Sequence, residues 1–167
     1  MKLSDGVEWG IHCCVLLAAL PPDATINGAA LAEFHGVSQS YLLKHLKALA
    51  EAGALESAPG PTGGYRLARP PTDLTLLDIV EAIEGTEPAL RCTEIRQRGP
   101  AALDASAYRR PCRVNAAMLR AESAWRAALK NETIASLVVA VAATADPRSV
   151  RKAGPWLQRN VRLPSTK

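Results

Sequence analysis

Apolar residues recur at helical spacing in four separate segments of the first 85 residues. In residues 5–20 the stripe consists of Val7, Ile11, Val15 and Leu16, and Cys14 can join it. Similar stripes follow in residues 27–36, 38–53 and 75–85. The segments are closed by helix-ending residues, namely Pro21-Pro22, Gly36, Gly53 and Gly85. The pattern therefore predicts four helices.

Small polar residues stand where three of these helices begin. Asn27, Ser38 and Thr75 each predict an N-terminal cap, because their side-chain oxygens can accept a free backbone N–H. The second and third helices are joined by a short turn at Gly36, which is the helix-turn-helix pattern. Residues 54–67 hold two short strand candidates around a Pro/Gly turn and predict a β-hairpin, the wing of a winged helix.

Periodicity is lost after Gly85 and returns later. Residues 86–111 contain five Arg and several Pro, and they predict a long loop. Helical stripes return from Pro111 to about Lys130 and from Thr133 to Ala143, and Trp156 is expected to hold part of the Arg-rich tail. We expect a mainly α protein with a small β wing, organised as a winged helix-turn-helix domain (1–85), a loop (86–111), dimerisation helices (112–143) and a C-terminal tail (144–167).

Composition limits the functional classes. The chain has 167 residues, of which 48% are hydrophobic and 22% charged, as in a folded domain rather than a disordered chain. It has no apolar run of about 18 residues and no signal-peptide pattern, so we expect a cytoplasmic protein without a membrane partner. The sequence contains no set of a nucleophile with its base and no phosphate-binding loop, so it does not predict an enzyme.

The charge is unevenly distributed. The formal net charge is +4, but residues 1–85 carry 5 basic and 10 acidic groups (−5), and residues 86–167 carry 15 basic and 6 acidic groups (+9). DNA contacts in the winged half must therefore come from a few placed cations and polar groups.

The predicted recognition helix supplies most of the candidate DNA contacts. Its first turn can lie in the major groove, and lysines further along can neutralise phosphates. The wing adds two glycines that allow close backbone approach, and an arginine. The candidates are Ser38, Gln39, Ser40, Tyr41, Lys44, Lys47, Gly63, Gly64 and Arg66. Tyr41 could equally pack against the wing, and the other side chains could be a cap and a solvated face.

One helix-turn-helix covers only a half-site of DNA. The apolar C-terminal helix is therefore well explained as the arm of a homodimer, which would bind a double-stranded, palindromic operator. The alternative is a helix that packs only on its own subunit.

Four motifs give the chain a resemblance to a known family. They are MKLS (1–4), VSQSYL (37–42), GPTGGYRLARPP (60–71) and TLLDIVEAIEG (75–85). With them, residues 1–143 resemble the winged-helix transcription regulators that include IscR, NsrR and RsrR. The chain departs from many members at Pro59, where they have Arg, and at Leu43 and Lys44, where they have Glu or Gln. The resemblance therefore does not supply the operator sequence.

The cysteines resemble one branch of that family. Iron–sulfur members usually have three clustered cysteines in the loop, whereas this loop has only Cys92 and Cys112. The RsrR-like branch, with EWGIHCC (8–14) and RCTEIRQRGP (91–100) as matching segments, binds a [2Fe–2S] cluster. By position the resemblance implies the ligands Glu8 and His12 from one subunit and Cys92 and Cys112 from the other.

The residues themselves are compatible with this ligand set. Glu8 and His12 are four residues apart and share one side of a helix, and His can replace Cys on a cluster iron. Trp9, between them, is a candidate redox relay or ordinary packing. Alternatively, the Glu/His pair is a surface hydrogen bond, and Cys92 and Cys112 form a regulatory disulfide or stay inert. The remaining cysteines, Cys13 and Cys14, are expected to be core residues.

Two functions therefore compete. The first is a redox-sensing, DNA-binding transcription regulator, expected to be a repressor, whose operator affinity depends on an iron–sulfur cluster held across the homodimer. The alternative is a cluster-free winged-helix repressor regulated by cysteine oxidation or a small ligand.

Overall fold

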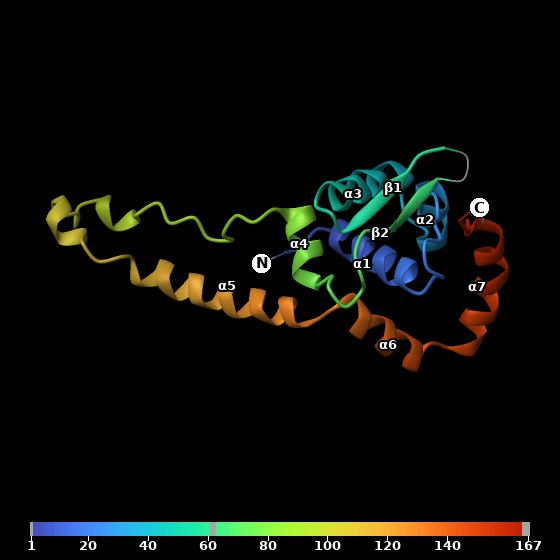
Figure 1. The fold of residues 1–167 in the computed structure, drawn as a ribbon. Helices are drawn as coiled ribbons and strands as arrows, with labels where there is room; N and C mark the ends of the chain where they lie inside the picture. The colour runs from blue at the N-terminus through green and yellow to red at the C-terminus, as the bar shows by residue number, and fades with distance from the viewer. Residues whose placement is uncertain (1, 61–62, 165–167) are drawn as a thin grey trace.

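The computed structural model describes residues 2–60 and 63–164 (Figure 1). The elements in chain order are α1 (Asp5–Ala18), α2 (Gly28–His35), α3 (Gln39–Glu51), β1 (Leu55–Ala58), β2 (Gly64–Leu67), α4 (Leu76–Glu84), the 3-10 turns η1 (Ile95–Gln97) and η2 (Ala105–Tyr108), α5 (Arg113–Asn131), α6 (Ile134–Thr144) and α7 (Pro147–Asn160). The mainly helical fold with a small wing agrees with the sequence-based prediction. Met1, Pro61 and Thr62 of the quoted motifs, and residues 165–167 of the tail, lie outside the described residues.

The first four helices and the hairpin form one body, and the loop 86–111 with α5 projects from it as a long arm (Figure 1). Strands β1 and β2 are antiparallel, with Leu55 opposite Leu67. At the base of the arm, the guanidinium of Arg126 in α5 forms an ion pair with Glu81 in α4. Helix α6 lies below the body in Figure 1, and α7 lies beside it.

The core of the body lies between α1 and α3. Leu42, Leu46 and Leu49 of α3 are fully buried, and so are Cys13 and Cys14 of α1, as predicted for the two cysteines. The three leucines follow helical spacing, so α3 buries one face and leaves the other to solvent. The exposed face includes Tyr41, which is 65% exposed.

Two of the three predicted caps form. The Asn27 side chain accepts a hydrogen bond from the backbone N–H of Ala30, and Thr75 forms a reciprocal capping box with Asp78. Ser38 occupies the predicted N-cap position of α3, but the expected side-chain hydrogen bond does not form: its hydroxyl lies 3.2 Å from that of Ser40 and does not bond the helix backbone. The hydroxyl of Ser38 is therefore exposed at the start of α3.

The tail predicted for residues 144–167 is largely the helix α7. The sequence contained a signal for it, because Asp146 followed by Pro147 is an N-cap followed by a favoured first helical residue. Pro155 inside the segment argued against a helix. The expectation for Trp156 is confirmed: its ring lies 4.9 Å from that of Phe34 in α2. In the described parts of the chain, no helix combines the length and apolar character needed to cross a membrane.

Replacing Leu46 with Ala should lower the free energy of unfolding by about 2–5 kcal/mol, because Leu46 is fully buried and its removal leaves a cavity. Urea denaturation followed by circular dichroism measures the change. Tyr41→Ala on the exposed face of the same helix is the control and should change stability by less than about 0.5 kcal/mol. Equal losses for the two variants would contradict the assignment of the two faces of α3.

Candidate functional site

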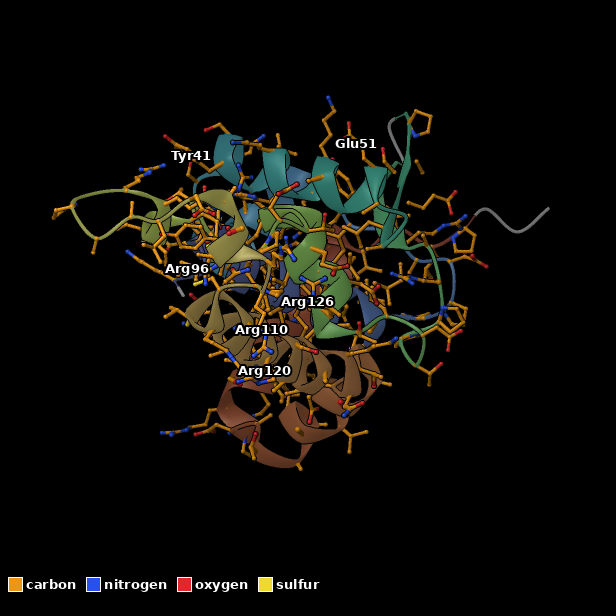
Figure 2. All side chains as sticks on the ribbon, turned by 90° about the vertical axis from the view of Figure 1, so that its left-hand side faces the viewer. Tyr41, Glu51, Arg96, Arg110, Arg120 and Arg126 are labelled. Carbon is orange, nitrogen blue, oxygen red and sulfur yellow. The ribbon has the colours of Figure 1, made fainter. Side chains whose placement is uncertain are left out.

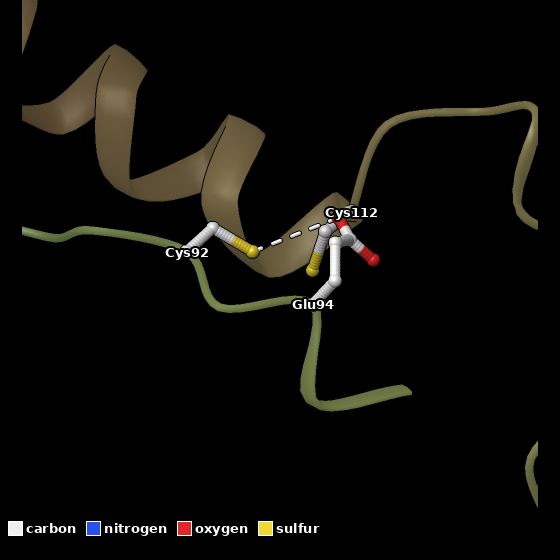
Figure 3. A group of neighbouring side chains, drawn as sticks. All are labelled: Cys92, Glu94 and Cys112. Carbon is white, nitrogen blue, oxygen red and sulfur yellow. Dashed lines mark hydrogen bonds between the residues drawn. The ribbon is translucent and has the colours of Figure 1, made fainter. Parts of the chain in front are cut away.

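Cys92 and Cys112, which both belong to the arm, come together in space (Figure 3). Cys92 lies in the loop and is exposed, whereas Cys112 immediately precedes α5 and is buried. Glu94 joins them: the Cys92 thiol donates to its Oε1 over 3.7 Å, and one ligand atom from each residue lies within 4.8 Å of the others. Two sulfurs and a carboxylate at this separation can hold a metal ion or part of a cluster.

Glu94 was not among the ligands predicted from the sequence. Its backbone has a φ of 48°, in the left-handed region, and its carboxylate binds the Arg96 guanidinium over 2.7 Å. This local turn aims the carboxylate at the cysteines. Its position two residues after Cys92 was the only signal in the sequence.

The surroundings of Cys112 favour its thiolate. The backbone N–H groups of Asn115 and Val114 at the start of α5 point at the sulfur and lower its pKa, against the opposing effect of desolvation. The nearby Arg96 guanidinium lowers the pKa further. A thiolate is the form of cysteine that binds metals.

Glu8 and His12 are exposed on α1, one turn apart. Together with Leu3, Asp5 and other residues they line a hollow of about 350 Å³. Among the residues that the structure describes, the group around Cys92 and Cys112 includes neither of them. In Figure 1, α1 lies within the body while the loop extends away from it. One chain therefore presents the four predicted ligands as two separate pairs.

His12 has a histidine neighbour that sequence reasoning missed. The ring centroid of His35 in α2 lies 5.9 Å from that of His12. Burial lowers the pKa of His35, and the proximity of His12 lowers it further. His35 is therefore held in its neutral form next to the helix that carries the Glu/His pair.

Trp9 lies on the side of α1 that faces α3. Its ring meets the ring of His45 edge-on, with centroids 6.1 Å apart. A Cβ atom on Gly6, one turn earlier, would lie 2.3 Å from the same histidine ring. His45 of the recognition helix therefore fits into a space that Gly6 leaves open, directly beside Trp9.

Cys13 and Cys14 cannot act as accessible ligands. Burial raises the pKa of Cys13 to about 12 and raises that of Cys14 as well. Both thiols are fully buried in the core and stay protonated at neutral pH.

The candidate DNA-binding residues at the start of α3 form an exposed row. Ser38, Gln39, Ser40, Tyr41, Lys44 and Lys47 are all exposed, and Lys47 pairs with Glu51 over 3.6 Å. In Figure 2, which faces the end of the arm, Tyr41 and Glu51 mark this edge of the body, and the labelled arginines of the loop and α5 lie below it.

The wing residues serve the fold in ways that the sequence did not reveal. A Cβ atom on Gly63 would lie 2.1 Å from the Ala58 carbonyl oxygen, and one on Gly64 would lie 2.6 Å from the Ile26 backbone. The guanidinium of Arg66 binds Asp23 and Glu56, each over 2.9 Å. The glycines thus allow close packing inside the protein, and the charge of Arg66 is balanced by two carboxylates.

Comparison with known proteins agrees with this architecture. Residues 3–140 match the profile of the Rrf2 family, described as "Iron-dependent Transcriptional regulator". Over 85 residues the chain is 40% identical to YwgB of Bacillus subtilis (strain 168), covering 51% of this chain and 54% of YwgB. Over 86 residues it is 38% identical to BadM of Rhodopseudomonas palustris, covering 52% and 54%. Both names describe HTH-type transcriptional regulators, and the chain spans about half the length of these relatives.

Solved structures share the fold over most of the chain. CymR (YrzC), the global cysteine regulator of B. subtilis, has a TM-score of 0.65 at 22% identity and covers 83% of this chain and 97% of its own. IscR of T. potens has a TM-score of 0.64 at 22% identity and covers 90% and 96%. At this identity the comparison establishes the fold alone.

Thiol labelling should divide the cysteines into two classes. In the native, metal-free protein at pH 8, a maleimide reagent should modify Cys92 rapidly and leave Cys13 and Cys14 unmodified, because the last two are buried and their raised pKa values keep them protonated. Peptide mass spectrometry identifies the modified residues. In urea all the cysteines should react, and native-state modification of Cys13 as fast as that of Cys92 would contradict this assignment.

Proposed function

The chain belongs to the Rrf2 family of transcription regulators, and from this premise we propose that it is a DNA-binding repressor whose operator affinity is set by a redox-active [2Fe–2S] cluster held across a homodimer. Family membership confirms the sequence-based prediction of a regulator rather than an enzyme. The observation that carries the proposal is the presence of two separate pairs of candidate ligands on one chain, Cys92 with Cys112 on the arm and the exposed Glu8 with His12 on α1.

DNA binding is assigned to α3 and the wing. The exposed first turn of α3 suits the major groove, where Ser38, Gln39, Ser40 and Tyr41 reach base edges and phosphates. Lys44 and Lys47 then add phosphate contacts. In the wing, Gly63 is buried and both Gly63 and Gly64 pack against the backbone of the protein, so we assign them to shaping the wing that faces DNA. Arg66 contributes less charge than an unpaired arginine because Asp23 and Glu56 balance it.

In the proposed dimer, a second subunit completes the cluster site, because one chain keeps its two pairs of candidate ligands apart. Val114 and Met118 on α5 are 69% and 45% exposed, which is unusual for an apolar helix face in solvent. We propose that this face pairs with its copy in a homodimer with a palindromic operator. Cys92 and Cys112 of one arm would then lie against Glu8 and His12 of the partner subunit.

The donor set fits a [2Fe–2S] cluster. Cys92 and Cys112 place two sulfurs together, and the Glu8/His12 pair adds one oxygen and one nitrogen, which makes the four ligands that two irons require. Such a cluster supplies one-electron redox chemistry when bound. Glu94 is a fifth candidate donor, because its carboxylate already lies beside the sulfurs.

Helix α1 connects the cluster ligands to the recognition helix. Glu8 and His12 lie on its exposed side, while Gly6 and Trp9 lie against His45 of α3. Because His45 fits closely at Gly6, a small displacement of α1 requires a displacement of α3. Trp9 is the proposed relay between the two.

A second candidate function is a cluster-free repressor controlled by the thiols or by a small ligand. It is favoured by the short separation of the Cys92 and Cys112 sulfurs in the metal-free chain. A low-molecular-weight disulfide could oxidise the pair, accepting two electrons and two protons and leaving as two thiols while Cys92 and Cys112 form one disulfide.

Mixed dimers test whether the ligands come from two subunits. One partner carries Glu8→Ala and His12→Ala, and the other carries Cys92→Ala and Cys112→Ala. Each homodimer should lack the cluster, whereas the mixed dimer should regain one site of two, because the cysteines of the first subunit meet the intact pair of the second. Iron and sulfide analysis with the visible spectrum measures the recovery.

A mixed dimer without cluster would overturn the shared site. Retention of the full spectrum in the Glu8→Ala, His12→Ala homodimer would remove both residues from the ligand set, and loss of the spectrum in Glu94→Ala would place Glu94 in it. A colourless, iron-free wild-type protein after anaerobic purification would favour the thiol-controlled repressor.

Redox control of DNA binding should depend on His45. The wild-type protein should bind an operator selected from random-sequence duplexes with different affinities in its oxidised and reduced states. In His45→Ala the ratio of the two affinities should fall towards one while the visible spectrum is unchanged, because the substitution removes the ring that packs between α1 and α3. Fluorescence anisotropy measures both affinities. Equal wild-type affinities would overturn the switch, and an unchanged ratio in His45→Ala would overturn this route.

A further inference from the structure

Helix α7 and the segment that follows it form a strongly basic surface outside the part of the chain that matches the family profile. The profile ends at residue 140, whereas α7 begins at Pro147. Residues 147–164 contain five cationic side chains and no acidic one: Arg148, Arg151, Lys152, Arg159 and Arg162. The family resemblance therefore does not account for this surface.

The basic surface is held against the helix-turn-helix rather than hanging free. Trp156 packs on Phe34, and its indole N–H donates to Glu33 of α2 over 3.2 Å. Beyond α7, the backbone of Arg162 exchanges two hydrogen bonds of 2.8 Å with Thr25. α7 thus lies along α2, the first helix of the helix-turn-helix, as Figure 1 shows at its C-terminal end.

The end of this surface adjoins the wing. Ile26, the residue after Thr25, exchanges backbone hydrogen bonds with Tyr65 of β2. Residues 25–26 therefore pair with Tyr65 of the wing through Ile26 and with Arg162 through Thr25. The backbone at Arg162 thus continues the hydrogen-bonded pairing that begins in the wing. This places Arg159 and Arg162 on the side of the wing strand β2, near the start of α2.

The charges at this end have no carboxylate partner among the described residues. Arg148, at the far end of α7, is paired with Asp146 over 2.6 Å. Arg159 and Arg162 take part in none of the ion pairs found in residues 2–60 and 63–164; the contact described for the Arg162 guanidinium is to the backbone oxygen of Arg159. No carboxylate in these residues therefore balances their positive charge.

A DNA-binding function needs such cations here. Residues 1–85 have a net charge of −5, and the wing arginine, Arg66, is balanced by Asp23 and Glu56. DNA carries one negative charge for each ~1.7 Å of its axis, so an acidic winged domain is repelled unless cations are brought next to it.

We propose that Arg159 and Arg162, presented beside the wing by α7, bind phosphates of the DNA that flanks the sequence contacted by α3. The contact is to the DNA backbone and is independent of base sequence. The inference rests on the proposed DNA-binding function, and it adds a binding surface that lies outside the helix-turn-helix and wing.

The salt dependence of DNA binding tests the proposal. The full-length chain is compared with Arg159→Gln, Arg162→Gln on a duplex selected from a random-sequence pool by the wild-type protein. The slope of log K against log salt concentration should become shallower by about 0.9 for each phosphate that is no longer neutralised, about 1.8 for each protomer. The fold should persist, because Arg162 is held to Thr25 through its backbone.

Control variants of α7 and duplexes of different length distinguish a flanking phosphate contact from other causes of a changed slope. Arg148→Gln removes one exposed but paired charge from the same helix and should change the slope less than Arg159→Gln. Trp156→Ala, which removes the packing on Phe34 but no charge, should also reduce the slope. Lengthening the duplex with scrambled flanking sequence should increase wild-type affinity and have no effect on the double variant.

Two results would overturn the inference in distinguishable ways. If the wild-type protein binds the selected duplex and the double variant has the same slope and the same dependence on duplex length, the flanking contact is absent while the DNA-binding function stands. If the wild-type protein selects and binds no duplex, the proposed function and the inference fail together.

Discussion

The close approach of α1 to α3 and α4 is the constraint on which the rest of the structure depends. A Cβ atom on Gly6 would lie 2.3 Å from the His45 ring, and one on Gly10 would lie 2.8 Å from the Ile83 side chain. Glycine at both positions lets side chains of α3 and α4 pack directly onto the backbone of α1, and Cys13 and Cys14 fill the next turn as small buried residues. A helix packed so tightly on one side cannot move without its neighbours.

The opposite side of α1 carries the exposed candidate ligands. Glu8 and His12 are one turn apart on its exposed surface, while the thiols lie on an arm that projects from the body. A single chain thus keeps the two pairs of proposed ligands apart, and in the proposed site assembly with a second chain would unite them. The helix that carries Glu8 and His12 is packed against α3 through Gly6, Trp9 and His45, which is the contact that the proposed redox control would use.

Electrostatics imposes a second requirement on the molecule. The winged domain is acidic, and its wing arginine is neutralised within the protein. Binding a polyanion then depends on cations from other parts of the chain. Packing of Trp156 on Phe34 brings the basic α7 to the helix-turn-helix, where, in the proposed complex, its charges would reduce the repulsion that an acidic domain experiences next to DNA.

The sequence by itself determined the features that depend on near neighbours: helices α1 to α6 and the wing, the caps at Asn27 and Thr75, the left-handed turn at Gly36 and the burial of the core cysteines. These follow from propensities, caps and periodicity within a few residues. Only the tertiary structure decided which distant groups meet. Arg66 is paired across 43 residues with Asp23, and Trp156 bonds a residue 123 positions away. The turn that aims Glu94 at Cys92 and Cys112, and the separation of both cysteines from α1, likewise depend on the path of the loop and α5. No local pattern encodes such partners, because they are selected by the packing of whole helices against one another.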